Sequence, residues 1–287
     1  MYYLMFIYIS AVWGSSFILM KWAQLSYDFL SLATYRFMGA ALILYICRLF
    51  VKNKTKFPKE DFGALFLLAV STIIPFAVQP FLIEKYGSAF IGMMVIFVPL
   101  LTILVSIPLI QRFPVKKEII GVLGGLIFSW LIVNDGMKRE VSIIDFFLAF
   151  CIPFSYALGN TYTKKRLSHI KSIDLSLGIM ALSAVLLWPF ATYLEDVKIN
   201  DHFTSATTYL VLLGIFGTGI PVIFFYYLIN KRGPLFAGMV TYIIPIGALI
   251  WGAVDGEEIT ALQIFAMAGL LGMVALVQWP VKKKVEA

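Results

Sequence analysis

The stretch FLIEKYGSAFIGMMVIFVP (81–99) recurs later in the chain as YLINKRGPLFAGMVTYIIP (227–245). The two stretches are related by a constant offset of 146 positions, and eight of their nineteen residues are identical. Shared apolar composition explains only part of this identity. It does not explain a paired lysine, glycine and proline, at Lys85/Lys231, Gly87/Gly233 and Pro99/Pro245. The offset is close to half of the chain, so we predict two related halves, 1–140 and 141–287.

The composition is that of an integral membrane protein. Of the 287 residues, 61% are hydrophobic and only 14% are charged, whereas a soluble domain carries about 25% charged residues. This excludes a soluble domain, a disordered chain and a small disulfide scaffold. A spanning helix takes about 20 residues. Apolar runs between charged or turn-rich breaks predict an all-α protein with ten spans: 2–20, 29–51, 62–83, 88–110, 118–134, 143–163, 173–193, 206–229, 235–254 and 261–280.

The distribution of basic residues orients these spans. If the N-terminus is cytoplasmic, the cytoplasmic connections carry 17 Lys and Arg and the outer connections carry five. Such an excess marks the cytoplasmic side of a membrane protein, so both termini are predicted to be cytoplasmic. The same rule explains the net charge of +7 without nucleic acid as a partner. The basic runs Lys52–Lys59, Lys164–Arg166 and Lys282–Lys284 are interpreted as orientation signals that contact anionic lipids.

The odd number of spans in each half has a consequence for function. Two copies of a five-helix unit must enter the membrane in opposite orientations. Inverted repeats are the plan of many secondary transporters, in which the substrate binds near the midplane between the repeats.

Several short motifs resemble a known family. They are WGSSF (13–17), YRF (35–37), prolines within the fourth and ninth spans, and GEEIT (256–260). With the ten-helix duplication, they resemble the EamA branch of the drug/metabolite transporter superfamily over nearly the whole chain. The resemblance implies a transporter whose commonest role is export of amino acids or related metabolites. The short basic loops and the absence of targeting segments suggest the inner (plasma) membrane as its location. The glutamate that family members often place after the fourth span falls on Gln111, whereas Glu257 occupies the repeat partner.

Two polar features lie well inside the first two spans. Trp13, Ser16 and Met20 share one helix face, and an indole buried away from the interface needs a partner for its N–H. Trp13 is therefore predicted either to line a cavity or to mediate a helix contact. Arg36 is costly inside a span and is a functional candidate by default. It could attract a substrate carboxylate or phosphate, pair with Asp28, or cap carbonyls of a neighbouring helix.

Further candidates lie in later spans. Gln79 falls between Pro75 and Pro80 and should point inward, because its amide would be costly in lipid. Six weaker candidates are Ser155, Tyr156, Asn160, Tyr226, Thr241 and Tyr242. The alternative for the tyrosines is a place in the aromatic belts at the membrane interfaces.

Prolines and small residues suggest how the spans bend and pack. Pro99 and Pro245 lie near the centres of their spans, where each should remove a backbone hydrogen bond and kink the helix, either to gate a cavity or only to pack. Small-residue ridges occur at Gly121/Gly125, Ala248/Gly252 and Ala268/Gly272. We expect them to pack within the chain, although the resembling family uses the fifth and tenth spans in dimer contacts, which implies a homodimer as the alternative.

The sequence lacks the residue patterns that a membrane-embedded enzyme would need. No span holds two acids at helical spacing, no histidine lies mid-membrane, and Cys47 and Cys151 lack metal-type spacing. We therefore predict no enzyme, no cofactor and no metal. The leading hypothesis is an alternating-access transporter of a small metabolite such as an amino acid. The alternative cargoes are nucleotide or sugar conjugates and lipophilic or quaternary cations, and the alternative class is a membrane scaffold or receptor.

Overall fold

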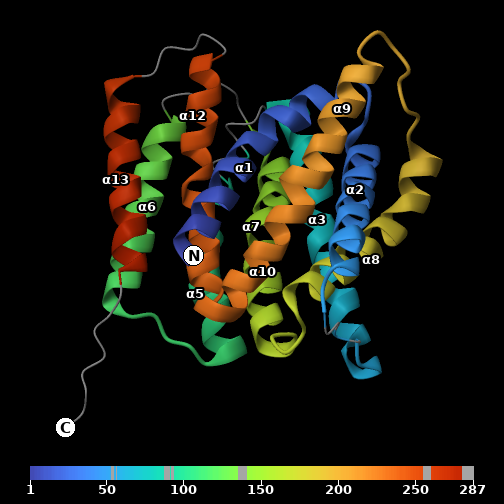
Figure 1. The fold of residues 1–287 in the computed structure, drawn as a ribbon. Coiled ribbons are helices and arrows are strands. Elements are labelled where there is room, and N and C mark those ends of the chain that lie inside the picture. Colours follow the sequence, from blue (N-terminus) through green and yellow to red (C-terminus); the bar gives the residue numbers. More distant parts are fainter. Residues whose placement is uncertain are drawn as a thin grey trace.

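The computed structural model describes residues 1–52, 55, 57–86, 91, 94–134, 141–254 and 260–279, and it contains helices and no strands in these ranges (Figure 1). The long apolar runs form helices because this conformation satisfies every backbone polar group within the segment. In chain order the elements are α1 (Tyr2–Ala23), α2 (Phe29–Leu49), η1 (Lys59–Asp61), α3 (Phe62–Tyr86), α5 (Val98–Ile110), α6 (Lys116–Asn134), α7 (Ile143–Arg166), α8 (Ser172–Leu194), α9 (Phe203–Gly214), η2 (Ile215–Gly219), α10 (Ile220–Arg232), α11 (Pro234–Gly238), η3 (Met239–Tyr242), α12 (Ile244–Val254) and α13 (Ala261–Gln278).

Each predicted span contains one or more of these helices. Within the described ranges, six helical stretches are long and apolar enough to cross a membrane. They are Tyr2–Ala23, Phe29–Leu49, Lys59–Tyr86, Ile143–Arg166, Ser172–Leu194 and Phe203–Arg232, and shorter apolar helices cover Val98–Ile110, Pro234–Gly247 and Ile264–Gln278. Parts of the predicted 88–110 span, most of GEEIT (256–260) and the basic run Lys282–Lys284 lie outside the described residues.

The prediction of a proline kink within a continuous helix is wrong at both sites. The helix that contains Pro99 begins at Val98, and the helix that contains Pro245 begins at Ile244. Each proline therefore lies in a first turn, where its missing N–H removes no helical hydrogen bond. Irregular turns precede both helices, at residues 96–97 and 239–243, so each chain segment is broken rather than bent.

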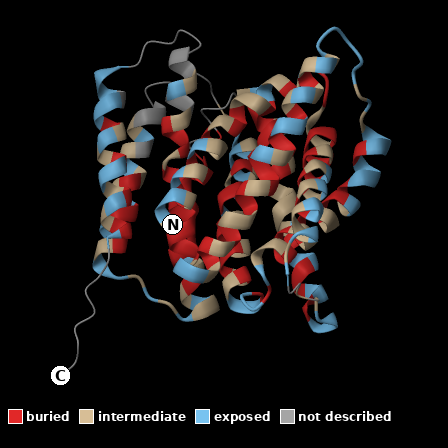
Figure 2. Cartoon of the chain, viewed as in Figure 1, coloured by how far each residue is buried: buried red, intermediate tan, exposed pale blue. Residues whose placement is uncertain are grey.

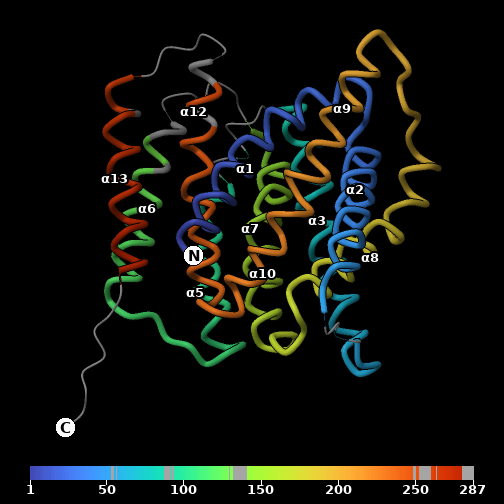
Figure 3. Tube along the Cα trace, viewed as in Figure 1, coloured from blue at the N-terminus to red at the C-terminus, as the bar shows by residue number. Residues whose placement is uncertain are grey.

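The helices pack in pairs that exchange under the 146-residue offset. α1 packs against α12 and against α9 and α10, whereas α7 packs against α5 and against α3 (Figure 1). α2 and α8 pack on each other, as do α6 and α13, and the latter pair stands at one edge of the bundle (Figure 3). Buried residues lie on the helix faces that point into the bundle, whereas the outer faces are exposed (Figure 2). Many exposed side chains are large and apolar, which suits contact with lipid.

Glycines allow the closest helix contacts. A Cβ atom on Gly14 of α1 would lie 3.2 Å from the Cα of Gly247 in α12, and one on Gly247 would lie 2.8 Å from the Cα of Gly14. A Cβ atom on Gly121 of α6 would overlap the Cγ2 methyl group of Val277 in α13. Gly121 therefore packs within the chain, as expected. Gly272 has open space around it, and the side-chain positions of the Ala248/Gly252 ridge lie outside the described residues.

Polar contacts join the α2–α8 pair at one end of the bundle. Lys198, in the segment after α8, contacts Asp28 just before α2, with Nζ 2.6 Å from Oδ1. This hydrogen bond raises the pKa of the Lys198 ammonium group. Glu195 accepts hydrogen bonds from the backbone N–H groups of Leu30 and Ser31, at 2.9 and 2.6 Å, and so satisfies two free donors at the start of α2.

A related arrangement occurs at the opposite end of the same pair. Arg48, near the end of α2, donates to Asp174 in the first turn of α8 at 2.6 Å. The backbone N–H of Thr55 donates to the other oxygen of Asp174 at 2.7 Å. Asp174 follows Asp28 by 146 positions, so equivalent carboxylates hold the two ends of one helix pair.

The α1–α12 contact yields a test of the packing. We expect Gly247→Ala to lower the thermal unfolding temperature of the detergent-purified protein, because the new methyl group would overlap the backbone of Gly14; overpacking of this kind costs about 1–3 kcal/mol. Gly63→Ala is the matched control, because a Cβ at this helical position meets nothing within 4 Å. Equal unfolding temperatures for the two variants would contradict the close backbone contact.

Candidate functional site

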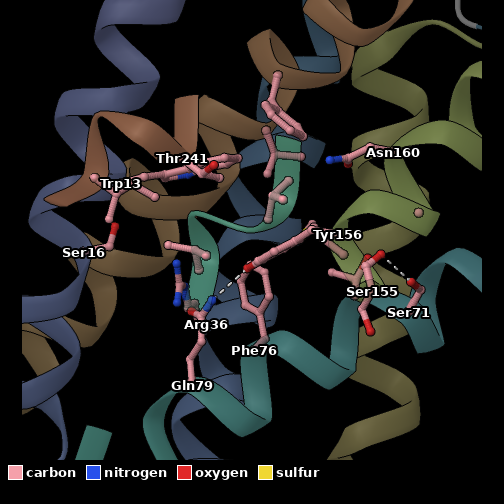
Figure 4. Close-up of a pocket in the computed structure, with 18 of the residues that line it drawn as sticks. Trp13, Ser16, Arg36, Ser71, Phe76, Gln79, Ser155, Tyr156, Asn160 and Thr241 are labelled. Carbon is pink, nitrogen blue, oxygen red and sulfur yellow. Dashed lines mark hydrogen bonds between the residues drawn. The ribbon is translucent and has the colours of Figure 1, made fainter. Parts of the chain in front are cut away.

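A cavity of about 80 Å³ lies at the centre of the bundle, between α1, α2, α3, α7, α8, α10 and the broken stretches before α5 and α12 (Figure 4). It is the meeting point of most of the residues that the sequence analysis selected. The predicted candidates that line it are Trp13, Ser16, Arg36, Gln79, Ser155, Tyr156, Asn160, Tyr226 and Thr241.

α1 contributes one helix face to the cavity. Trp13, Ser16 and Met20 all line it, as their shared face predicts. The indole of Trp13 lies against the ring of Phe225, with 4.8 Å between ring centroids. Trp13 therefore combines both predicted positions, since it lines the cavity and mediates a contact between α1 and α10.

Arg36 enters the cavity from α2. Its side chain is buried, with 4% of the residue exposed. Nε donates a hydrogen bond to Thr218 Oγ1 at 2.6 Å, Nη1 lies 3.4 Å from the Met20 sulfur, and the guanidinium carbon lies 4.4 Å from the centroid of Phe76. The predicted alternative of a pair with Asp28 is wrong, because that carboxylate is at the end of the bundle on Lys198. Among the described residues, no carboxylate forms an ion pair with Arg36.

The amide of Gln79 points inward, as predicted. Its Nε2 donates to the Tyr156 hydroxyl at 3.1 Å, which links α3 to α7 across the cavity. Figure 4 shows this pair beside the guanidinium of Arg36. A second link between the same helices runs from Ser71 Oγ to the carbonyl of Ser155 at 3.0 Å. Asn160 is 95% buried on the same face of α7 as Tyr156 and points into the cavity (Figure 4).

The lining repeats with the sequence offset of 146. Several positions separated by this offset both face the cavity, although they come from different helices. They are Val95 and Thr241, Val98 and Ile244, Phe76 and Val222, and Gln79 and Phe225. The offset that was found in the sequence therefore relates residues of the two halves that line one cavity.

Tyr242 lies outside the site, so its selection as a substrate-binding candidate is corrected. Its ring is fully buried, and its hydroxyl donates to the backbone carbonyl of Val122 in α6 at 2.7 Å. Tyr242 and its neighbour Thr241 point in different directions, because the η3 turn between α11 and α12 separates adjacent side chains. Pro99 and Pro245 adjoin the lining residues Val98 and Ile244, but they do not line the cavity.

Sequence reasoning missed several residues of the site. Thr218 holds Arg36 and lies in the π-helical segment η2, where its hydroxyl donates to the carbonyl of Leu213 five residues earlier at 3.0 Å. Phe76 and Phe225 supply aromatic walls. A signal was present, because the offset of 146 pairs Thr72 with Thr218 and Pro75 with Pro221, which extends the repeat beyond the stretch where it was recognised.

The chemistry of the cavity is that of a binding site. Arg36 is the one charged side chain among its described lining residues, and the other side chains of the lining are aromatic, aliphatic, thioether, hydroxyl or amide. The described residues contain no group of three or more His, Cys, Asp or Glu side chains that is suited to hold a metal ion. Such a lining can recognise a small molecule by shape, hydrogen bonds and one positive charge.

Comparison with known proteins agrees with this architecture. The model of the EamA-like transporter family matches residues 1–134 and again residues 144–278. A chain from Buchnera aphidicola (subsp. Schlechtendalia chinensis) named "Uncharacterized transporter in trpA 3'region" is 25% identical, and the match covers 93% of this chain and 91% of the relative. The uncharacterized inner membrane transporter YedA of Escherichia coli (strain K12) is also 25% identical, over 93% of this chain and 87% of YedA.

The fold has a counterpart among solved structures. One crystal structure of a protein superposes with a TM-score of 0.80 at 17% sequence identity, covering 96% of this chain and 95% of that chain. Helices at the predicted spans, a central cavity and a family match to both halves of the sequence lead to one conclusion. The chain belongs to the EamA-like transporter family and is a multi-pass protein of the inner membrane.

Proposed function

We propose that this protein is a secondary transporter that works by alternating access. It exports a small polar or amphipathic metabolite across the inner membrane. The observation that carries the proposal is the central cavity, which both related halves line with residues that are paired by the 146-residue offset. When two related halves rock against each other, a site that lies between them opens first to one side of the membrane and then to the other.

The proposed topology is ten spans with both termini in the cytoplasm, formed by inverted repeats at 1–140 and 141–287. The double match of the family model supports this division, as does the exchange of helix pairs under the offset. The equivalent carboxylates Asp28 and Asp174 at opposite ends of the α2–α8 pair support the inversion. The two ends then offer comparable contacts for closing the inner and outer sides in turn.

The proposal treats the protein as a carrier without enzymatic activity. A scaffold or receptor does not require a central cavity that holds a buried charge within a duplicated bundle, whereas a carrier requires a central binding site. The acidic residues Asp28, Asp145 and Glu84 lie near helix ends, so we propose transport that follows the substrate gradient without a proton-carrying carboxylate. Amino acids are the cargo that the family resemblance implies. Nucleotide or sugar conjugates and lipophilic or quaternary cations are the alternative cargoes. A homodimer through the α6–α13 edge remains part of the proposal.

Transport by cavity variants tests the function. Trp13→Ala and Gln79→Ala should each reduce substrate flux into proteoliposomes by about tenfold or more, because each removes a wall or a polar contact of the cavity; a lost hydrogen bond of about 1.4 kcal/mol corresponds to tenfold. Expression and monodispersity in detergent should remain at the wild-type level. If both variants lower expression or monodispersity, and the flux of the protein that does fold is unchanged, the cavity assignment is wrong.

A matched pair of tyrosines separates the cavity from the surrounding bundle. Tyr156→Phe should reduce flux, because it removes the hydroxyl that accepts from Gln79. Tyr242→Phe should leave flux unchanged and lower stability by about 1 kcal/mol, since it removes only a bond to the α6 backbone. Parallel flux and thermal unfolding measurements check both results, and equal loss of flux in the two variants would contradict the assignment.

Labelling of single cysteines tests the topology. In a Cys47→Ala/Cys151→Ala background, a cysteine at Lys116 should resist a membrane-impermeant maleimide in intact cells and react after lysis. A cysteine at Lys198 should react in intact cells, because the segment after α8 is proposed to be external. Reaction of both positions, or the reverse pattern, would rule out ten spans with cytoplasmic termini.

A further inference from the structure

We propose that the cavity selects a small organic monoanion, a carboxylate with an apolar body and no ammonium group, and that the guanidinium of Arg36 is the group that binds the carboxylate. This inference rests on the proposed transport function, because it names the substrate class of the same cavity. It differs from the amino-acid cargo that the family resemblance implies.

The first observation is the incomplete pairing of a buried charge. Of the five N–H donors of a guanidinium, one bonds Thr218 and one points to the Met20 sulfur, which is a weak acceptor. The other donors have no protein acceptor among the described residues. An ionised group in an apolar interior is costly unless it is paired, and a carboxylate fits the planar fork of Arg through two parallel hydrogen bonds.

The second observation is the absence of a counterpart for a cation. The described lining of the cavity contains no Asp or Glu, so the ammonium of an amino acid would have no charge partner there. Arg36 would also repel it at close range, because like charges interact strongly where water is excluded. The same argument disfavours quaternary amines. A dianion would leave one of its charges unpaired, so a single negative charge matches the single buried cation.

The third observation is the polar and apolar arrangement around Arg36. The Tyr156 hydroxyl accepts a hydrogen bond from Gln79 and has its own proton left to donate, and it lies beside the guanidinium (Figure 4). It can therefore donate to a carboxylate oxygen that Arg36 holds. Trp13, Phe76 and Phe225 form apolar walls near these donors, which suit an aliphatic or aromatic body. The volume of about 80 Å³ favours a short one.

Three molecules with the same branched four-carbon body test the charge selectivity directly. Isovalerate, valine and isobutylamine share the branched skeleton, and they carry respectively a carboxylate alone, both groups, and an ammonium alone. Each is titrated to about 10 mM, which is ten times a millimolar Kd and enough for a measurable stabilisation. The measurement is the thermal unfolding temperature of the purified full chain at constant chloride concentration.

Variants assign the selectivity to Arg36. Isovalerate should stabilise the wild type, and valine and isobutylamine should bind at least about tenfold more weakly. Arg36→Gln should weaken isovalerate binding by about tenfold to a hundredfold, the range expected for a lost hydrogen bond to a charged group. Arg36→Lys should retain part of the binding, since it keeps the charge but not the fork. Arg166→Gln is the matched control, because it removes an exposed positive charge at the end of α7.

Four results would overturn the inference. The first two are stabilisation of the wild type by valine, or by isobutylamine, that equals or exceeds stabilisation by isovalerate. The third is binding of isovalerate to Arg36→Gln with the affinity of the wild type. The fourth is the absence of stabilisation by any monocarboxylate from acetate to 3-phenylpropionate. If Arg36→Gln does not fold, Arg36→Lys and the wild-type comparison still decide.

Flux measurements separate this inference from the transport proposal. If proteoliposomes that contain the wild type and those that contain Arg36→Lys exchange labelled valine equally well, the transport function stands and the anion inference is wrong. Binding of isovalerate that depends on Arg36, without exchange of labelled isovalerate above empty liposomes, would keep the anion site and overturn transport.

Discussion

Within a bilayer, every backbone N–H and C=O group must find its partner inside the protein, and the rest of this structure follows from that constraint. It makes the apolar runs helical and confines irregular backbone to places that protein surrounds. The breaks before α5 and α12 obey it, because both adjoin the central cavity rather than the lipid-facing surface. The prolines Pro99 and Pro245 begin new helices there. Broken helices let backbone and side chains change direction at the depth where a ligand binds.

The helix pairs α6–α13 and α2–α8 have different roles in the fold. The α6–α13 pair packs through glycines at one edge and contributes no residue to the described cavity lining. The α2–α8 pair supplies Arg36 to the cavity and carries ion pairs at both of its ends. Mutations in these two pairs should therefore have different consequences, on assembly for the first and on binding and conformational change for the second.

The sequence predicted the helical segments well because long apolar runs leave few alternatives in a membrane. Most of the residues that it selected for the site line the cavity, since a tryptophan, an arginine and a glutamine inside apolar runs are costly unless they face one another. The failures have local causes. Tyr242 was selected with Thr241, but the η3 turn directs their side chains to different places. The Asp28–Arg36 pair looked plausible along one helix, whereas Lys198, 170 residues away, takes the carboxylate. Thr218 looked ordinary because its role depends on the π-helical segment that contains it.

The contact between Arg36 and Thr218 spans 182 residues of sequence. At a synthesis rate of about 5–20 residues per second, Thr218 leaves the ribosome roughly 10–40 s after Arg36. During this interval the second helix already carries its charge, but the helix that supplies the hydroxyl does not yet exist. Until then, the guanidinium of Arg36 lacks the hydroxyl of Thr218, and water, lipid headgroups or insertion factors must satisfy it instead. Completion of the cavity is thus a late step of biogenesis, and a chain truncated before η2 would be a substrate for membrane quality control.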